Sequence, residues 1–151
     1  MTKTELLNAY DLIGSETEKM FNCTKEEMSR SYGPGKWNIR QILHHLADVE
    51  LAFHNRLKKI IAEPKQVIWA YEPDLWAIQF SYIDAPLDKA LRVYQLCREL
   101  NRELADTYFE TMPEKEFVHS KMGLRTLAAE LERLITHNEH HLNQIRNALA
   151  C

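Results

Sequence analysis

Apolar residues recur every three or four positions in four long stretches of the chain, residues 4–21, 38–62, 87–111 and 124–149. This spacing places apolar side chains on one face of a helix and is typical of amphipathic helices that pack together. No stretch shows a convincing alternation of apolar and polar residues, as a half-buried strand would. The pattern predicts an all-α four-helix bundle, formed as one domain over residues 1–151.

The connections between these stretches differ in length. Residues 33–35, Gly-Pro-Gly, end a short turn that Thr24 can cap, and Asn38 is suited to cap the second helix. Residues 63–85 are irregular and rich in proline, with a short helix expected within 74–82. A connection this long suits a crossover between helices 2 and 3 better than a tight hairpin. Its aromatic residues either cover one end of the bundle or, through Trp76 or Tyr82, wall a substrate pocket: Trp69, Tyr71, Trp76, Phe80 and Tyr82.

Composition and charge exclude several classes of protein. Hydrophobic residues make up 45% of the chain, charged residues 27%, and the formal net charge is −3, all ordinary for a soluble globular protein. The basic residues are scattered, so no nucleic-acid partner is expected. With no apolar window near the roughly 18 residues of a membrane span, and no signal-peptide pattern, we expect a cytoplasmic protein without a membrane partner. Cys23, Cys97 and Cys151 are too widely spaced for a disulfide framework, and Cys97 falls at a core position.

Histidines lie beside the apolar faces of two predicted helices. His137 and His141 are four residues apart, so they project from the same side of the last helix, while His140 points towards water. On the second helix His45 lies on the flank of the apolar face, whereas His44 points almost directly away from it. An isolated pair of this kind is more often two stray surface histidines. Three neutral imidazoles brought together by packing of the two helices would instead form a metal site with an open, catalytic-type position.

Four other polar residues bear on the site. Glu50 falls near the apolar face of the second helix and requires a partner, which the sequence does not name. Asp48 lies one turn after His45, where it can support an imidazole, act as a base on bound water, or simply face solvent. His119 is expected in a loop or at a helix cap, and His54 on a helix surface.

The order of these motifs resembles the DinB/YfiT superfamily. Residues 37–40, Trp-Asn-Ile-Arg, precede His-Leu-Ala-Asp at 45–48, and a later H-x-x-x-H continues as His-Leu-Asn-Gln-Ile at 141–145. Gly123 with Thr126 and Leu127 also resembles the family pattern, so the likeness runs from about residue 36 to 149, with a suitable first helix before it. The family comprises four-helix bundles, many of them described as metal-dependent enzymes, including bacterial thiol-dependent transferases. The resemblance implies a metal triad at His45, His137 and His141, and it also implies a homodimer.

This resemblance and the residues together predict one divalent ion, zinc or nickel, because imidazole suits both. The expected activity is a metal-dependent transfer of a low-molecular-weight thiol or hydrolysis of a small molecule; the alternative is a bundle that binds metal or a small ligand without turnover. Asn138 stands where the zinc-protease helix has its glutamate base, which argues against a peptidase. Protons are expected to compete with the ion near the ordinary histidine pKa of about 6.5.

Overall fold

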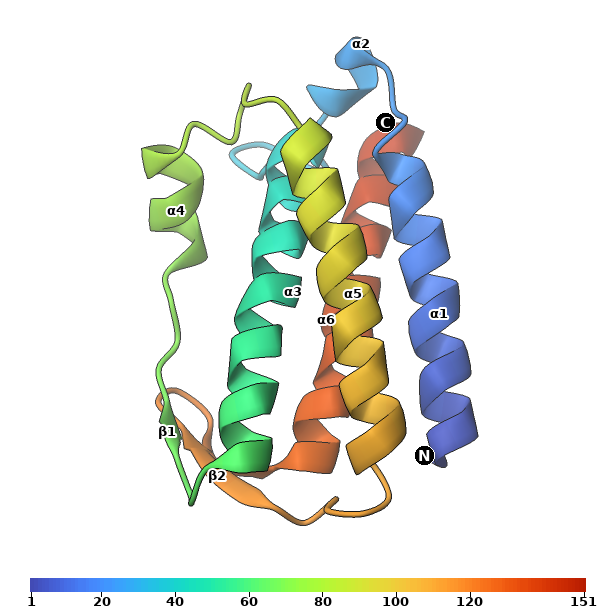
Figure 1. Ribbon diagram of the computed structural model, residues 1–151. Helices are drawn as coiled ribbons and strands as arrows, with labels where there is room; N and C mark the ends of the chain where they lie inside the picture. The colour runs from blue at the N-terminus through green and yellow to red at the C-terminus, as the bar shows by residue number, and fades with distance from the viewer.

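Four long helices run alongside one another in the computed structural model, which describes residues 1–151 (Figure 1). They are α1 (Lys3–Met20), α3 (Ile39–Ala62), α5 (Asp88–Tyr108) and α6 (Leu127–Ala150). Two short helices, α2 (Lys25–Met28) and α4 (Pro73–Gln79), lie in the connections. The predicted four-helix bundle is therefore confirmed.

The long connection between α3 and α5 is a crossover. Figure 1 shows α3 and α5 pointing the same way, so the chain returns along the outside of the bundle, through β1 and α4, before α5 begins. The short helix expected within residues 74–82 is α4, and it packs against α3. Because the crossover lies along α3, it places aromatic side chains beside the histidines of that helix.

A small sheet at one end of the bundle corrects the prediction that the chain has no strands. It comprises β1 (Val67–Ile68), β2 (Glu116–His119) and β3 (Gly123–Thr126); β1 pairs with β2 in parallel, and β2 pairs with β3 antiparallel. Strands of two to four residues are too short to show an alternating pattern. Because residues 123–126 form β3, the last helix begins at Leu127 rather than near Leu124, which is exposed on that strand.

Polar caps set the helix starts that the sequence predicted. Asn38 accepts a hydrogen bond from the backbone N–H of Gln41, whose side chain in turn accepts one from the backbone N–H of Asn38. Thr24 forms the same reciprocal pair with Glu27 at the start of α2. Each such cap stabilises a helix by about 1 kcal/mol. The Asn38 cap fixes where α3 begins and hence the direction in which His45 projects.

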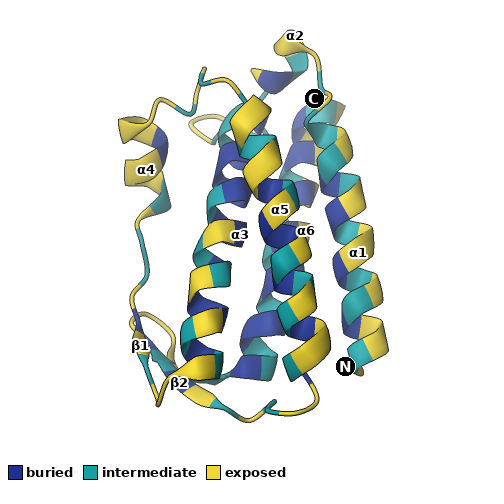
Figure 2. Cartoon of the chain, viewed as in Figure 1, coloured by how far each residue is buried: buried dark blue, intermediate teal, exposed yellow.

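The buried face of each long helix turns towards the bundle axis (Figure 2). Two apolar clusters form the core, one around Phe53, Leu57 and Phe117, the other around Ile42 and Tyr94. Cys97 is buried, as predicted, and all three cysteines are free thiols. None of the helices has the length and apolar character needed to cross a membrane.

Glu50 finds its partners on α1 and α5, inside the bundle. Its carboxylate forms an ion pair with Arg98 at 2.7 Å and accepts hydrogen bonds from the Tyr10 hydroxyl and the Asn101 amide, each at 2.9 Å. Arg98 also donates to the Tyr10 carbonyl and lies against Gly14, where any Cβ would collide with the guanidinium. Three helices are thus joined through one buried carboxylate.

Candidate metal centre

The packing of α3 against α6 brings His45, His137 and His141 together. One nitrogen from each ring lies within 4.8 Å of the others. The ring centroids of His45 and His141 are 4.7 Å apart, those of His137 and His141 are 4.6 Å apart, and those of His45 and His137 are 5.3 Å apart. Three imidazole nitrogens at this separation can reach one divalent ion after small side-chain movements, since zinc–nitrogen bonds are about 2.0–2.1 Å long.

Their neighbours His44 and His140 lie outside the cluster. His140 is exposed on α6, as expected. His44 is buried rather than solvent-facing, because the crossover covers it: its ring stacks on Tyr82 at 4.4 Å, and its Nε2 lies 3.2 Å from the Ala85 carbonyl oxygen. His54 is half-buried and contacts Asn101 through Nδ1 at 3.1 Å.

Burial keeps the three clustered imidazoles neutral at physiological pH. It lowers the pKa of His45 to about 2, that of His137 to about 3 and that of His141 to about 4, with repulsion between neighbouring histidines adding to the effect for His45 and His137. A neutral imidazole offers a lone pair, which is the form that ligates metal. Protonation of these histidines, expected near pH 6.5 from the sequence, is therefore shifted to lower pH in the folded protein.

Hydrogen bonds on the far ring nitrogens orient two of the rings. His141 Nδ1 lies 2.8 Å from the Gln144 side-chain oxygen, which can only accept, so Nδ1 carries the proton and Nε2 holds the lone pair. The Tyr71 hydroxyl lies 3.4 Å from His45 Nδ1. Buried His137 Nδ1 has no hydrogen-bond partner, a state that costs free energy unless a ligand or ion compensates. The donor set therefore fits a divalent metal ion.

The acid-dependence of stability follows from these lowered pKa values. Below about pH 6.5 the unfolded chain binds protons at these histidines while the folded chain does not, so the free energy of unfolding falls as pH drops and is fully retained above that pH. Each such histidine contributes about 1.4 kcal/mol per pH unit. In metal-free protein, His137→Gln should reduce the slope between pH 6 and 5 by about that amount, measured by urea unfolding. An unchanged slope would show that His137 is not held neutral by the fold.

Asp48 and Asn138 have partners other than the imidazoles. The Tyr82 hydroxyl donates to Asp48 at 2.6 Å, and burial raises the pKa of Asp48. Asp48 makes no hydrogen bond to any of the three clustered rings. Buried Asn138 donates to Thr17 at 2.6 Å and accepts from the Tyr94 hydroxyl at 2.8 Å. Asn138 therefore joins α6 to the core and has no base to offer, in agreement with the argument against a peptidase.

Two residues that the sequence did not place near the cluster lie beside it. Trp37 places its ring 5.1 Å from that of His45 and 6.5 Å from that of His141, at the edge of the site. His119 was expected in a loop or at a cap but is buried on β2 and lines a cavity with His45 and His137. Its two-residue spacing from buried Phe117 was the one available signal, because alternate strand residues share a face.

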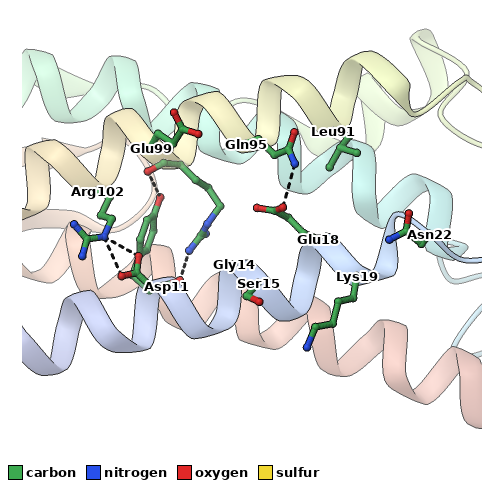
Figure 3. Close-up of a pocket in the computed structure, with 12 residues that line it drawn as sticks. Asp11, Gly14, Ser15, Glu18, Lys19, Asn22, Leu91, Gln95, Glu99 and Arg102 are labelled. Carbon is green, nitrogen blue, oxygen red and sulfur yellow. Dashed lines mark hydrogen bonds and ion pairs between the residues drawn. The ribbon is translucent and has the colours of Figure 1, made fainter.

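A separate, larger hollow between α1 and α5 lacks such a cluster (Figure 3). Its volume is about 830 Å³, and no histidine or cysteine lines it. The polar side chains across it bind one another: Arg102 donates to Asp11 at 2.8 Å, and Gln95 donates to Glu18 at 3.1 Å. Because these polar groups already have partners, this hollow is a weaker candidate for a functional site than the histidine cluster.

Comparison with known proteins finds similarity over most of the chain. The family model of the DinB superfamily matches residues 9–145. Two proteins of Oceanobacillus iheyensis, each named "Putative metal-dependent hydrolase", are 31% and 29% identical over alignments that cover 88% and 83% of this chain and 76% and 73% of the relatives. A solved structure, YfiT from Bacillus subtilis, is described as "a probable metal-dependent hydrolase with an unusual four-helix bundle topology". It matches with a TM-score of 0.89 at 21% identity, covering 98% of this chain and 86% of that one.

Proposed function

This chain belongs to the DinB superfamily, and on that premise we propose that it is a metal-dependent hydrolase of small molecules. The observation that carries the proposal is the cluster of His45, His137 and His141, three neutral nitrogen donors within 4.8 Å of one another. Three protein ligands leave a coordination position open for water or substrate, as in catalytic sites, whereas structural sites are closed by four. The relatives' names support hydrolysis as the reaction.

The residues around the histidine cluster have distinct roles in the proposed site. His45, His137 and His141 would hold one divalent ion, zinc or nickel, and Gln144 fixes the His141 tautomer. When bound, the ion supplies a Lewis acid and lowers the pKa of water at its open position towards 7. The ring of Trp37 limits access of solvent at the edge of the site.

Asp48 is proposed as a positioning residue rather than a ligand. Its bond to Tyr82 fastens the crossover to α3, and the same crossover carries Tyr71, whose hydroxyl lies 3.4 Å from His45 Nδ1. Loss of such support typically weakens metal binding by about 10–100-fold. Metal affinity of the Asp48→Asn protein, measured by competition with a chelator, separates this role from that of an unconnected surface aspartate, whose replacement would change nothing.

A thiol S-transferase is the second candidate, because the family resemblance includes such enzymes and a metal with an open position can also bind a thiolate. The test is a paired assay with metal-free and metal-loaded protein: hydrolysis of small activated esters and amides, and conjugation of several thiols to a model electrophile. Metal-dependent hydrolysis without thiol supports the hydrolase. Turnover only with added thiol supports the transferase, and no turnover in either arm supports a bundle that binds metal or ligand without catalysis.

The reaction should not depend on a thiol of the protein itself. Cys97 faces the core, Cys151 is terminal and exposed, and burial raises the pKa of Cys23 and Cys97, which keeps both protonated and weakly nucleophilic. Replacing all three by serine should leave the metal-dependent rate within about threefold of wild type, with some loss of stability from buried Cys97. A folded, metal-loaded but inactive cysteine-free protein would assign the chemistry to a protein thiol.

We further propose that the chain forms a homodimer. Large apolar side chains of the crossover remain exposed in the single chain, among them Trp69 at 78%, Ile78 at 76% and Phe80 at 55%. Exposed aromatic groups of this kind are enriched at interfaces. One chain has a mass of 17.8 kDa, and light scattering at micromolar protein should give twice that mass. A mass equal to one chain would end this proposal.

A further inference from the structure

A cavity of about 250 Å³ adjoins the metal centre and shares His45 and His137 with it. Its wall is formed by α3, α6, the segment that leads into α4, and the β2–β3 hairpin. The charged side chains that line it are all positive, Arg56, Lys121 and Arg133, although Lys121 is already paired with Glu72, which lies outside the lining. A molecule bound at the histidines can therefore extend into a positively charged recess.

Three guanidinium groups near this recess have only one carboxylate as their counter-charge. The carboxylate of fully buried Glu130 lies 3.6 Å from Arg56, 3.4 Å from Arg133 and 3.2 Å from Arg125. Three positive charges against one negative charge leave an excess of two. Burial lowers the pKa of Arg56 despite the attraction of Glu130. A buried positive charge without a full counter-charge is costly, and a bound anion would relieve that cost.

His119 adds an unpaired donor to the same wall. The backbone N–H of Lys121 donates to His119 Nδ1 at 3.2 Å, so Nδ1 is the acceptor nitrogen of the ring. Because burial lowers the pKa of His119, the ring is neutral and its one proton lies on Nε2. That nitrogen is buried without a partner, and the residue is only 3% exposed. A buried N–H donor facing no acceptor indicates a ligand that supplies one.

We propose that this recess binds an oxyanion of the substrate, a carboxylate or a phosphate, between Arg56, Arg133 and His119. Both guanidiniums and the His119 Nε2–H donate to it, in charge-assisted hydrogen bonds. The inference rests on the proposed function, since it places the reacting bond beside the histidine cluster and makes the substrate a small anionic ester or amide. The volume of the recess, about 250 Å³, leaves room for a small group only.

The test uses metal-free protein, because anions also bind metal ions directly. Inorganic phosphate and acetate are titrated separately at constant ionic strength, and the backbone amide signals of β2, β3 and α6 are followed by nuclear magnetic resonance. Saturable shifts are expected for at least one anion, and the tighter of the two identifies the anionic group. Arg133→Gln and His119→Leu should each weaken binding by about tenfold or more, the usual effect of losing a hydrogen bond to a charged group.

Two matched variants separate recognition from folding. His119→Gln retains an N–H donor and should retain binding, whereas Arg102→Gln removes a guanidinium from the distant α1–α5 surface and should bind as wild type. The proposal is overturned if neither anion binds, or if Arg133→Gln and His119→Leu bind as tightly as wild type. A protein that hydrolyses substrates with metal but binds no anion would refute the recess alone. Anion binding by a protein that never binds metal would refute the proposed function alone.

Discussion

The His141→Ala protein is expected to lose its metal and, with it, its metal-dependent activity. His141 supplies one of only three nitrogen donors, and two imidazoles cannot hold an ion with comparable strength. Because the loss of a hydrogen bond that merely supports a ligand already costs 10–100-fold in metal affinity, loss of the ligand should cost more than about 100-fold. Chelator competition measures the affinity, and hydrolysis of an activated ester measures the rate.

The matched control for this prediction is His140→Ala, one residue away on the exposed side of α6. It should keep wild-type metal affinity and activity. Both variants should retain the helical circular dichroism, since His141 lies at the rim of the core with 9% of its surface exposed. Equal loss of metal in both variants, or retention in both, would contradict the assignment of ligands.

The largest effect on stability is expected from Glu50→Ala. This change leaves Arg98 as an uncompensated buried charge and removes the side-chain acceptor of the Tyr10 hydroxyl and the Asn101 amide, which keep only backbone carbonyl acceptors. Breaking a buried ion pair by deleting one partner typically costs 3–5 kcal/mol, a large share of the roughly 5–15 kcal/mol by which a domain is stable. The free energy of unfolding from urea denaturation, at fixed pH and without metal, measures the loss.

Two further variants isolate the cause of that loss. Asp11→Ala removes the partner of Arg102 in an exposed ion pair between α1 and α5 and should cost less than about 1 kcal/mol. The double change Glu50→Leu with Arg98→Met removes both buried charges and should recover much of the stability. If Glu50→Ala costs no more than Asp11→Ala, the buried network does not hold the bundle together.

Helical periodicity was enough to predict the bundle and the sides of α3 and α6 on which His45, His137 and His141 lie. The phase of α6 sets His137 and His141 on one side and His140 on the other, and the cap at Asn38 fixes the phase of α3. The meeting of the two helices was a hypothesis, since periodicity defines the face of a helix but not its neighbour. Packing of α3 against α6 supplied that information.

Contacts between residues far apart in the sequence could not be predicted from helical periodicity. His44 was expected in solvent because its own helix offers no cover; the crossover, more than thirty residues later, provides it through Tyr82 and Ala85. Arg98 as the partner of Glu50 lies 48 positions away. The strands were missed because their short length hides their period, and with them the burial of His119.

One divalent ion is expected to be held by His45, His137 and His141. Anomalous diffraction from crystals of zinc-loaded protein, recorded on both sides of the zinc absorption edge, locates the ion. We expect a single strong peak about 2.0–2.1 Å from one nitrogen of each of the three rings. A peak coordinated by His44 or His140, or no peak among the three rings at saturating zinc, would contradict this expectation.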